Sequence, residues 1–205
     1  MNNVHQENGY PYADISIECP SRSDRLTAFF RIFCAIPILL LLCLLVGMKT
    51  GKGTAIGGGI VFLPTLLMIL FRNRYPKVWF EWSCYLTKYS TRVFSYLFLL
   101  RDEYPSVDEE QAVKLELRYP DVTTELHRGM PLVKWFLAIP HYIVLVFLFV
   151  GAIVATLIAW FSILFTGRYP AKQHAFVVAV FRWGLRVNAY AFLLLTDKYP
   201  PFKLF

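Results

Sequence analysis

Acidic residues are missing from the long apolar segments of this 205-residue chain. Neither Asp nor Glu occurs in residues 29–46, 60–71 or 132–165. Proton-coupled transporters usually place ionisable carboxyl groups within the membrane, where they form the proton pathway. The absence of such groups therefore argues against proton-coupled transport.

Histidine is scarce, and the four copies form no catalytic or metal-binding motif. There is no Ser-His-Asp order, no HExxH and no intramembrane pair of carboxylates, so the sequence predicts no catalytic residue and no cofactor. His141 follows Pro140 inside an apolar segment and is the one metal or haem candidate. No second ligand lies three or four residues further on, which favours a role in helix packing.

Cysteine is equally sparse, and Cys19, Cys34, Cys43 and Cys84 show no CxxC spacing. A disulfide framework or a zinc site is not expected, and we interpret these residues as small buried hydrophobes. The first 28 residues are polar, and the apolar segment after them lacks a small-residue cleavage site, so no signal peptide is predicted. No nucleic-acid-binding motif occurs either.

Apolar residues are plentiful, at 57% of the chain, together with a formal net charge of +7. Residues 132–165 carry a single charge, Lys134, near their start. A membrane-spanning helix needs roughly 20 apolar residues. The segment is too long for one upright helix and long enough for two short ones, so we expect a hairpin that turns at Gly151. Residues 29–71 predict a second hairpin around a glycine-rich connector.

The resulting prediction is an all-α membrane protein with four transmembrane helices. A flexible tail (1–12) precedes a first repeat (13–105), made of a short strand, a hairpin at about 29–71 and an amphipathic helix at about 78–100. An acidic linker (106–112) leads to a second repeat (113–205), with a strand, a hairpin at about 132–166 and an amphipathic helix at about 174–195. Each amphipathic helix either lies in the membrane interface or spans the membrane with a polar stripe facing protein.

Three sequence patterns occur twice and indicate a tandem duplication. ILFRNRYP (69–76) matches ILFTGRYP (163–170), FLLRDEYP (98–105) matches LLLTDKYP (193–200), and AIP occurs at 35–37 and 138–140. Basic positions recur with these anchors, which chance similarity of apolar segments would not produce. They pair Arg25 with Arg128, Arg31 with Lys134, Arg74 with Arg168, Lys88 with Arg182, and Arg92 with Arg186. Two parallel repeats predict pseudo-twofold symmetry about the membrane normal.

The segments CPSRSDRLTAFFRIFCAIP, FLAIPHYIVLVF, LFTGRYP and RWGLRVNAYAFLLLTDKYPPF resemble a prokaryotic membrane family catalogued as domain of unknown function 4389. The resemblance extends from about Tyr10 to Phe202 and is better in the second half, since the first half has Ile38 where the second has His141. It implies a multi-pass membrane protein and adds no catalytic residue.

The basic residues are the candidate site, as a cradle for anionic lipid headgroups. Trp82, Tyr89, Trp183 and Tyr190 are the predicted interfacial aromatics. The alternative is that these charges only orient the protein, because positive residues flank the cytoplasmic ends of membrane helices. The candidate headgroup ligands are Arg25, Arg31, Arg74, Lys88, Arg92, Arg128, Lys134, Arg168, Arg182 and Arg186.

We therefore expect a non-enzymatic accessory or scaffold subunit of a prokaryotic inner membrane, with both termini in the cytoplasm. Its predicted partners are anionic lipids and either a membrane protein or further copies of itself, with no nucleic acid. One alternative is a small oligomeric channel or transporter, which would show saturable solute flux. Another is a lipid-modifying enzyme that uses His127 or His141.

Overall fold

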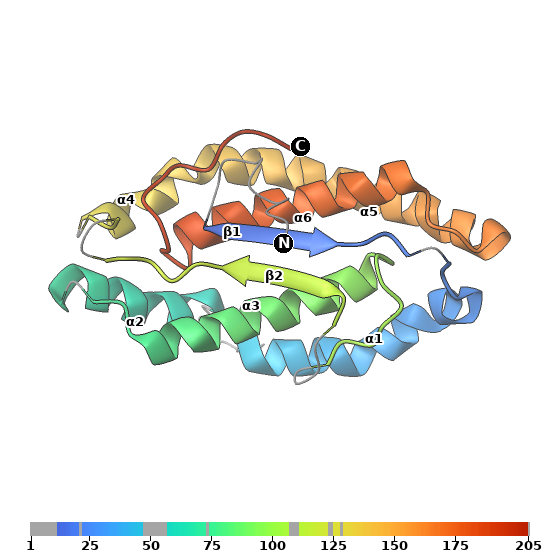
Figure 1. The fold of residues 1–205 in the computed structure, drawn as a ribbon, viewed down its shortest axis with the longest axis horizontal. Helices are drawn as coiled ribbons and strands as arrows, with labels where there is room; N and C mark the ends of the chain where they lie inside the picture. Colours follow the sequence, from blue (N-terminus) through green and yellow to red (C-terminus); the bar gives the residue numbers. More distant parts are fainter. Residues whose placement is uncertain are drawn as a thin grey trace, which may run out of the picture.

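The computed structural model describes residues 12–20, 22–46, 57–72, 74–106, 111–122, 125–127 and 129–204. Within these ranges the chain forms two groups of one strand followed by three helices (Figure 1). The first group is β1 (Ala13–Ile17), α1 (Arg25–Val46), α2 (Gly57–Arg72) and α3 (Lys77–Leu97). The second is β2 (Val113–Leu117), α4 (Met130–Leu137), α5 (Ile139–Thr166) and α6 (Ala171–Ala191).

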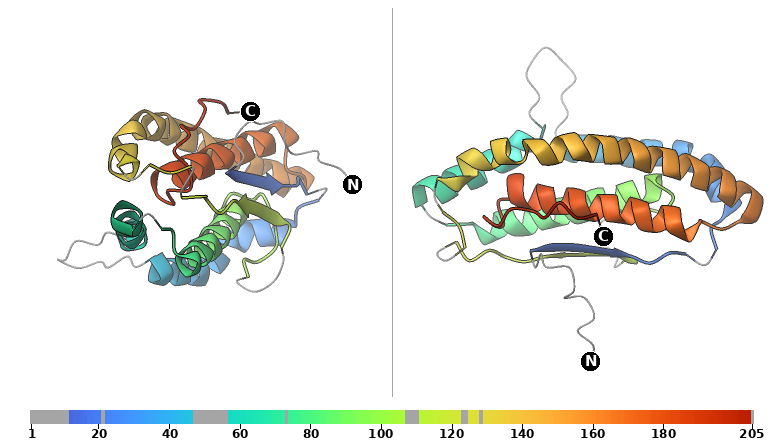
Figure 2. Two further views of the ribbon diagram at one scale, coloured as in Figure 1. Left: turned by 60° about the vertical axis from the view of Figure 1, so that its left-hand side comes forward. Right: turned by 90° about the horizontal axis from the view of Figure 1, so that it is seen from above.

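The elements are arranged in three layers (Figure 2). An outer layer holds α1, α2, α4 and α5, a middle layer holds α3 and α6, and the two strands form the opposite side. The helix α6 packs against α5 on one side and against β1 on the other. The main core lies where the sheet, α3, α5 and α6 meet, and it includes Ile15, Leu115 and Val177.

The predicted strands are confirmed, and they pair with each other. β1 and β2 form an antiparallel sheet with Ala13 opposite Leu117 and Ile17 opposite Val113. Alternate residues of each strand point into the core, as the period of two in the sequence requires. The sheet thus ties the start of the first half to the start of the second.

The prediction of four transmembrane helices is wrong. Among the described residues one helix, α5, is long and apolar enough to cross a membrane, and a second candidate arises only if the bent α1 is taken as one span. Gly151, the expected hairpin turn, lies inside α5. It has a packing role instead, because a Cβ there would meet the Phe176 ring at 3.4 Å.

The repeated AIP motif accompanies a bend of one helix in the first half and a break between two helices in the second. Proline lacks a backbone N–H, and its ring collides with the carbonyl four residues earlier. Pro37 therefore accounts for the 55° bend of α1 between Arg31 and Phe33. In the second half Pro140 follows the break between α4 and α5, and Ala138 is the single residue between the two helices.

The two amphipathic helices also differ from the prediction. α3 and α6 lie between the outer layer and the sheet, where protein covers two sides of each helix (Figure 2). Most of α6 is buried for this reason. Both helices end earlier than expected, because Leu99 and Leu194 adopt left-handed backbone angles, with φ of 62° and 55°, that turn the chain.

Candidate lipid-binding site

The outer face of α5 is apolar except for Thr166 at its last position. The helix has no charged residue over its 28 residues, and its exposed side chains recur every three or four positions, on one side. Its buried side carries alanines, which let α6 approach closely. The large exposed side chains are Ile139, Ile143, Val146, Phe147, Phe149, Val150, Ile153, Val154, Leu157, Ile158, Phe161 and Phe165.

The other outer-layer helices continue this apolar surface. α1 exposes a run of large side chains, and Phe33 retains 68% of its accessible area. α4 adds Phe136 at 73% exposure. The remaining members are Leu26, Phe29, Phe30, Ile36, Leu40, Leu41, Leu67, Phe71, Leu132, Val133, Trp135 and Leu137. Exposed apolar patches of this size mark interaction with a membrane or another protein.

The sheet side has the opposite character. Lys114 and Glu116 are exposed on β2, and Arg118 follows the strand. Asp14 is paired with Arg182 across the surface of β1. The molecule therefore has one apolar face and one charged face, on opposite sides of the three layers.

Two of the predicted headgroup ligands are buried in ion pairs. Arg31, 3% exposed, pairs with Asp102, donates to the carbonyl oxygen of Tyr96 at 2.9 Å and lies over the Tyr96 ring at 4.5 Å. Asp102 also accepts the backbone N–H of Asp24 at 3.0 Å. This network fastens the start of α1 to the turn after α3.

The second half repeats the arrangement. Lys134, fully buried, lies 2.7 Å from Asp197, donates to the carbonyl oxygen of Thr196 at 2.8 Å and faces the Tyr190 ring at 5.3 Å. Asp197 accepts the backbone N–H of His127 at 2.6 Å. The start of α4 is thereby fastened to the turn after α6.

Three further basic residues point into the fold. Arg182 donates to Asp14 and to the carbonyl oxygen of Ile15, both at 3.0 Å. Arg92 donates to the carbonyl oxygen of Ser106 at 2.7 Å, and Arg186 is only 4% exposed. The basic residues are four positions apart on one helix face, as predicted. Their side chains, however, are directed toward other parts of the protein.

Three exposed members of the predicted set lie at the ends of the outer layer. Arg74 follows α2, while Arg25 and Arg168 lie together where α1 begins and α5 ends, since Arg25 donates to the carbonyl oxygen of Phe165. Lys88 is exposed on α3, and Arg128 lies outside the described residues. Whether any of them binds lipid stays a prediction.

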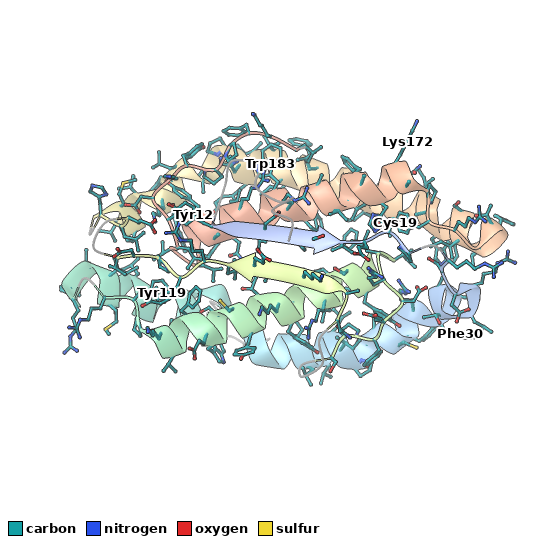
Figure 3. All side chains as sticks on the ribbon, viewed as in Figure 1. Tyr12, Cys19, Phe30, Tyr119, Lys172 and Trp183 are labelled. Atoms are coloured by element: carbon teal, nitrogen blue, oxygen red, sulfur yellow. The ribbon has the colours of Figure 1, made fainter. Side chains whose placement is uncertain are left out.

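A hollow of about 740 Å³ adjoins Arg74. Lys77, Tyr75 and Tyr119 line it as well, with Asp121 as its one acidic residue. Tyr119 donates to the carbonyl oxygen of Tyr75, which fixes the wall of the hollow. Figure 3 labels Tyr119 near one end of the molecule and Lys172 near the other, at the start of α6.

The four predicted interfacial aromatics likewise divide into one exposed residue and three buried ones. Trp82 is exposed, whereas Tyr89, Trp183 and Tyr190 are buried in the packing of α3 and α6. Cys19 and Cys34 are exposed, contrary to the expectation of buried cysteines.

His141 is enclosed by aromatic rings. Its Nδ1 accepts the indole N–H of Trp183 at 3.0 Å, and its ring stacks on Phe202 at 4.0 Å. The described residues contain no group of three His, Cys, Asp or Glu side chains suited to a metal. His141 joins α5, α6 and the C-terminal segment through packing.

An apolar groove of about 810 Å³ lies between α3, α5 and α6. Leu86, Phe94, Leu145, Phe149 and Phe181 are among its walls. This volume falls in the range of roughly 300–1,000 Å³ typical of small-molecule sites.

Sequence reasoning missed the two aspartates that neutralise the buried cations. Asp102 and Asp197 occupy equivalent places in FLLRDEYP and LLLTDKYP, so the available signal was that both this aspartate and the basic pair Arg31 and Lys134 occur in each half. It also missed a crossed pair of bonds from the RYP tyrosines. Tyr75 donates to the carbonyl oxygen of Leu193 and Tyr169 to that of Phe98.

One family model matches part of this chain. Residues 130–203 match the model described as domain of unknown function (DUF4389), which covers α4, α5, α6 and the segment after them. No curated protein and no solved structure matches the chain.

Proposed function

We propose that this protein is a non-enzymatic accessory protein of the membrane surface, in which the outer layer is embedded in one leaflet and anionic lipid headgroups are bound at its two ends. The observation that carries this proposal is the division of the molecule into an apolar outer layer and a charged sheet side. An amphipathic surface of this kind binds in the plane of the interface.

The packing of α6 argues against an upright α5. Twenty-eight residues give a helix about 42 Å long, enough to cross the roughly 30 Å hydrocarbon core. α6 and the sheet, however, lie alongside the middle of α5, because Ile15 of β1 and Phe149 of α5 line the same groove. An upright α5 would carry an open two-stranded sheet into hydrocarbon, where its edge groups find no hydrogen-bond partners.

A flat placement removes this conflict. The outer layer then enters the acyl chains, and the sheet with Lys114 and Glu116 stays in water. The RYP turns, which lead from the outer to the middle layer, come to the headgroup level. Arg74 and Arg168 are exposed there, where each cation is worth about 1 kcal/mol next to an anionic surface. The cytoplasmic leaflet carries the anionic lipids that attract such cations, so we place the protein on that side.

The proposal includes a tandem duplication with its pseudo-twofold axis along the membrane normal. The repeated order of elements, the two cation–aspartate networks and the crossed tyrosine bonds support it. An axis normal to the layers brings Arg74 and Arg168 to equal depth at opposite ends.

Replacing these two arginines tests the headgroup role. We expect Arg74→Gln/Arg168→Gln to lower the preference for phosphatidylglycerol over phosphatidylcholine, because about 2 kcal/mol of attraction is lost, or roughly 10- to 30-fold in affinity. The measurement is the lipid retained on protein purified from vesicles of both lipids, read by native mass spectrometry. Membrane association should persist, since apolar burial supplies it.

The matched control is Lys114→Gln/Arg118→Gln, which removes the same charge from the exposed sheet side. It should leave the retained lipid unchanged. Equal effects of the two double variants would contradict the headgroup role, because the loss would then follow net charge alone. Release of the unaltered protein from membranes by salt alone would contradict embedding.

A further inference from the structure

The groove between α3, α5 and α6 opens onto the face proposed to meet lipid. Val146, Phe149 and Val150 line the groove and are also exposed on the outer face of α5. Phe94 of α3 is exposed on the other side. The groove is therefore continuous with the apolar outer layer.

The polar residues on the α3 wall offer no free hydrogen-bond donors. Ser83, Thr87, Ser90 and Thr91 each donate to the carbonyl oxygen four residues earlier, at 2.7–2.8 Å. Their methyl and methylene groups remain to form the wall. A hydrogen-bond acceptor placed against this wall would find no donor on these side chains, so the wall favours an apolar occupant.

Gly184 widens the groove on the α6 side. A glycine in a helix interior costs about 1 kcal/mol relative to alanine, and close approach of another helix is the usual compensation. A Cβ at this position meets nothing within 4 Å among the described residues. The glycine leaves open space in the wall of the groove rather than a contact.

One polar group is left without a partner at the groove. The hydroxyl of Tyr142 is buried and has no hydrogen-bond partner among the described residues. Tyr142 and Asn188 both line the groove. A buried hydroxyl without a partner is costly, and an ester carbonyl oxygen would accept a hydrogen bond from it.

We propose that the groove holds one acyl chain of a membrane glycerolipid, with the Tyr142 hydroxyl and the Asn188 amide meeting the ester group. This proposal rests on the proposed embedding, since the chain enters sideways from the leaflet that holds the outer layer. The continuity of apolar surface, the absent donors and the space at Gly184 all fit a flexible hydrocarbon chain.

A phospholipid with a diazirine in its acyl chain tests the proposal. The full chain is reconstituted in vesicles of equal parts phosphatidylcholine and phosphatidylglycerol with a trace of this probe, irradiated, and mapped by peptide mass spectrometry. We expect cross-links in the groove, at Leu145 or Phe181, and on the outer face, at Ile158 or Phe161. In Gly184→Phe the groove cross-links should be lost and the outer ones kept.

The controls separate the possible failures. Ala175→Phe adds the same ring to an exposed position of α6 and should keep both sets of cross-links. Tyr142→Phe, which keeps the shape of the groove, should lower groove labelling. Outer-face labelling without groove labelling, or groove labelling that survives Gly184→Phe, overturns the acyl-chain site alone. Loss of outer-face labelling in the unaltered protein overturns the embedding, and the acyl-chain site with it.

Discussion

Asp197→Asn is expected to lower the free energy of unfolding by about 3–5 kcal/mol, because it leaves a buried cation without its counter-charge. Lys134 has no exposed area and lies 2.7 Å from an Asp197 oxygen. In a chain of this size the loss corresponds to a melting temperature roughly 6–20 °C lower. The measurement is thermal unfolding in a mild detergent.

Two further variants separate charge from packing. Lys134→Met in the Asp197→Asn background should recover most of the lost stability, since removing both charges of a buried pair is often nearly neutral. Glu116→Gln, an exposed change on β2, should alter stability by less than about 0.5 kcal/mol. A double variant as unstable as Asp197→Asn alone would contradict this account of the pair.

Acid is expected to destabilise the fold through His174. Burial of the ring, with a smaller effect of the Arg101 charge, lowers the pKa of His174 to about 4. His174 lies on α6, edge-on to the Tyr169 ring and only 4% exposed. The folded protein therefore keeps this side chain neutral where the unfolded chain binds a proton.

The sign of the pH effect follows from the lowered pKa. Above pH 6.5 both states hold the ring neutral, and stability is independent of it. Between about pH 6.5 and 4 the unfolded chain alone takes up the proton, so up to about 3 kcal/mol of stability is lost as the pH falls. His174→Leu should flatten this part of the stability curve, and Lys172→Ala, exposed on the same helix, should not. An unchanged slope in His174→Leu would contradict the assignment.

Local patterns in the sequence determined much of the fold. The alternating residues of β1 and β2 and the turns at both RYP motifs were readable directly. The distinction between apolar α5 and amphipathic α3 was readable as well. Each depends on neighbours along the chain, where the period of the pattern carries the information.

The prediction of a hairpin at Gly151 was wrong, because apolar composition does not show whether a long segment continues as one helix or turns back. Phe176, which packs next to Gly151 in the continuous helix, lies 25 positions away from it and leaves no local signal. The burial of Arg31 and Lys134 in ion pairs was missed for the same reason. Nothing near Arg31 or Lys134 indicates that Asp102 and Asp197 close over them from the far end of each half.

The depth of α5 in the membrane tests the central claim most directly. Ile143, Val154 and Phe165 lie on the exposed face of α5 at intervals of 11 residues, or about 16 Å. Three single-cysteine variants are made in a protein whose native cysteines are replaced by serine, and each is labelled with a fluorophore. The variants are Ile143→Cys, Val154→Cys and Phe165→Cys. They are studied in membrane vesicles from expressing cells, where the protein keeps one orientation. A spin-labelled quencher lipid is confined to one leaflet.

In-plane embedding predicts that the fluorophores at 143 and 165 are quenched from the same leaflet and to the same extent, with 154 quenched at least as strongly. A label at Lys114→Cys on the sheet side should escape the quencher in the acyl chains. Quenching of one end of α5 from one leaflet and of the other end only from the opposite leaflet would show a spanning helix, and would contradict the account.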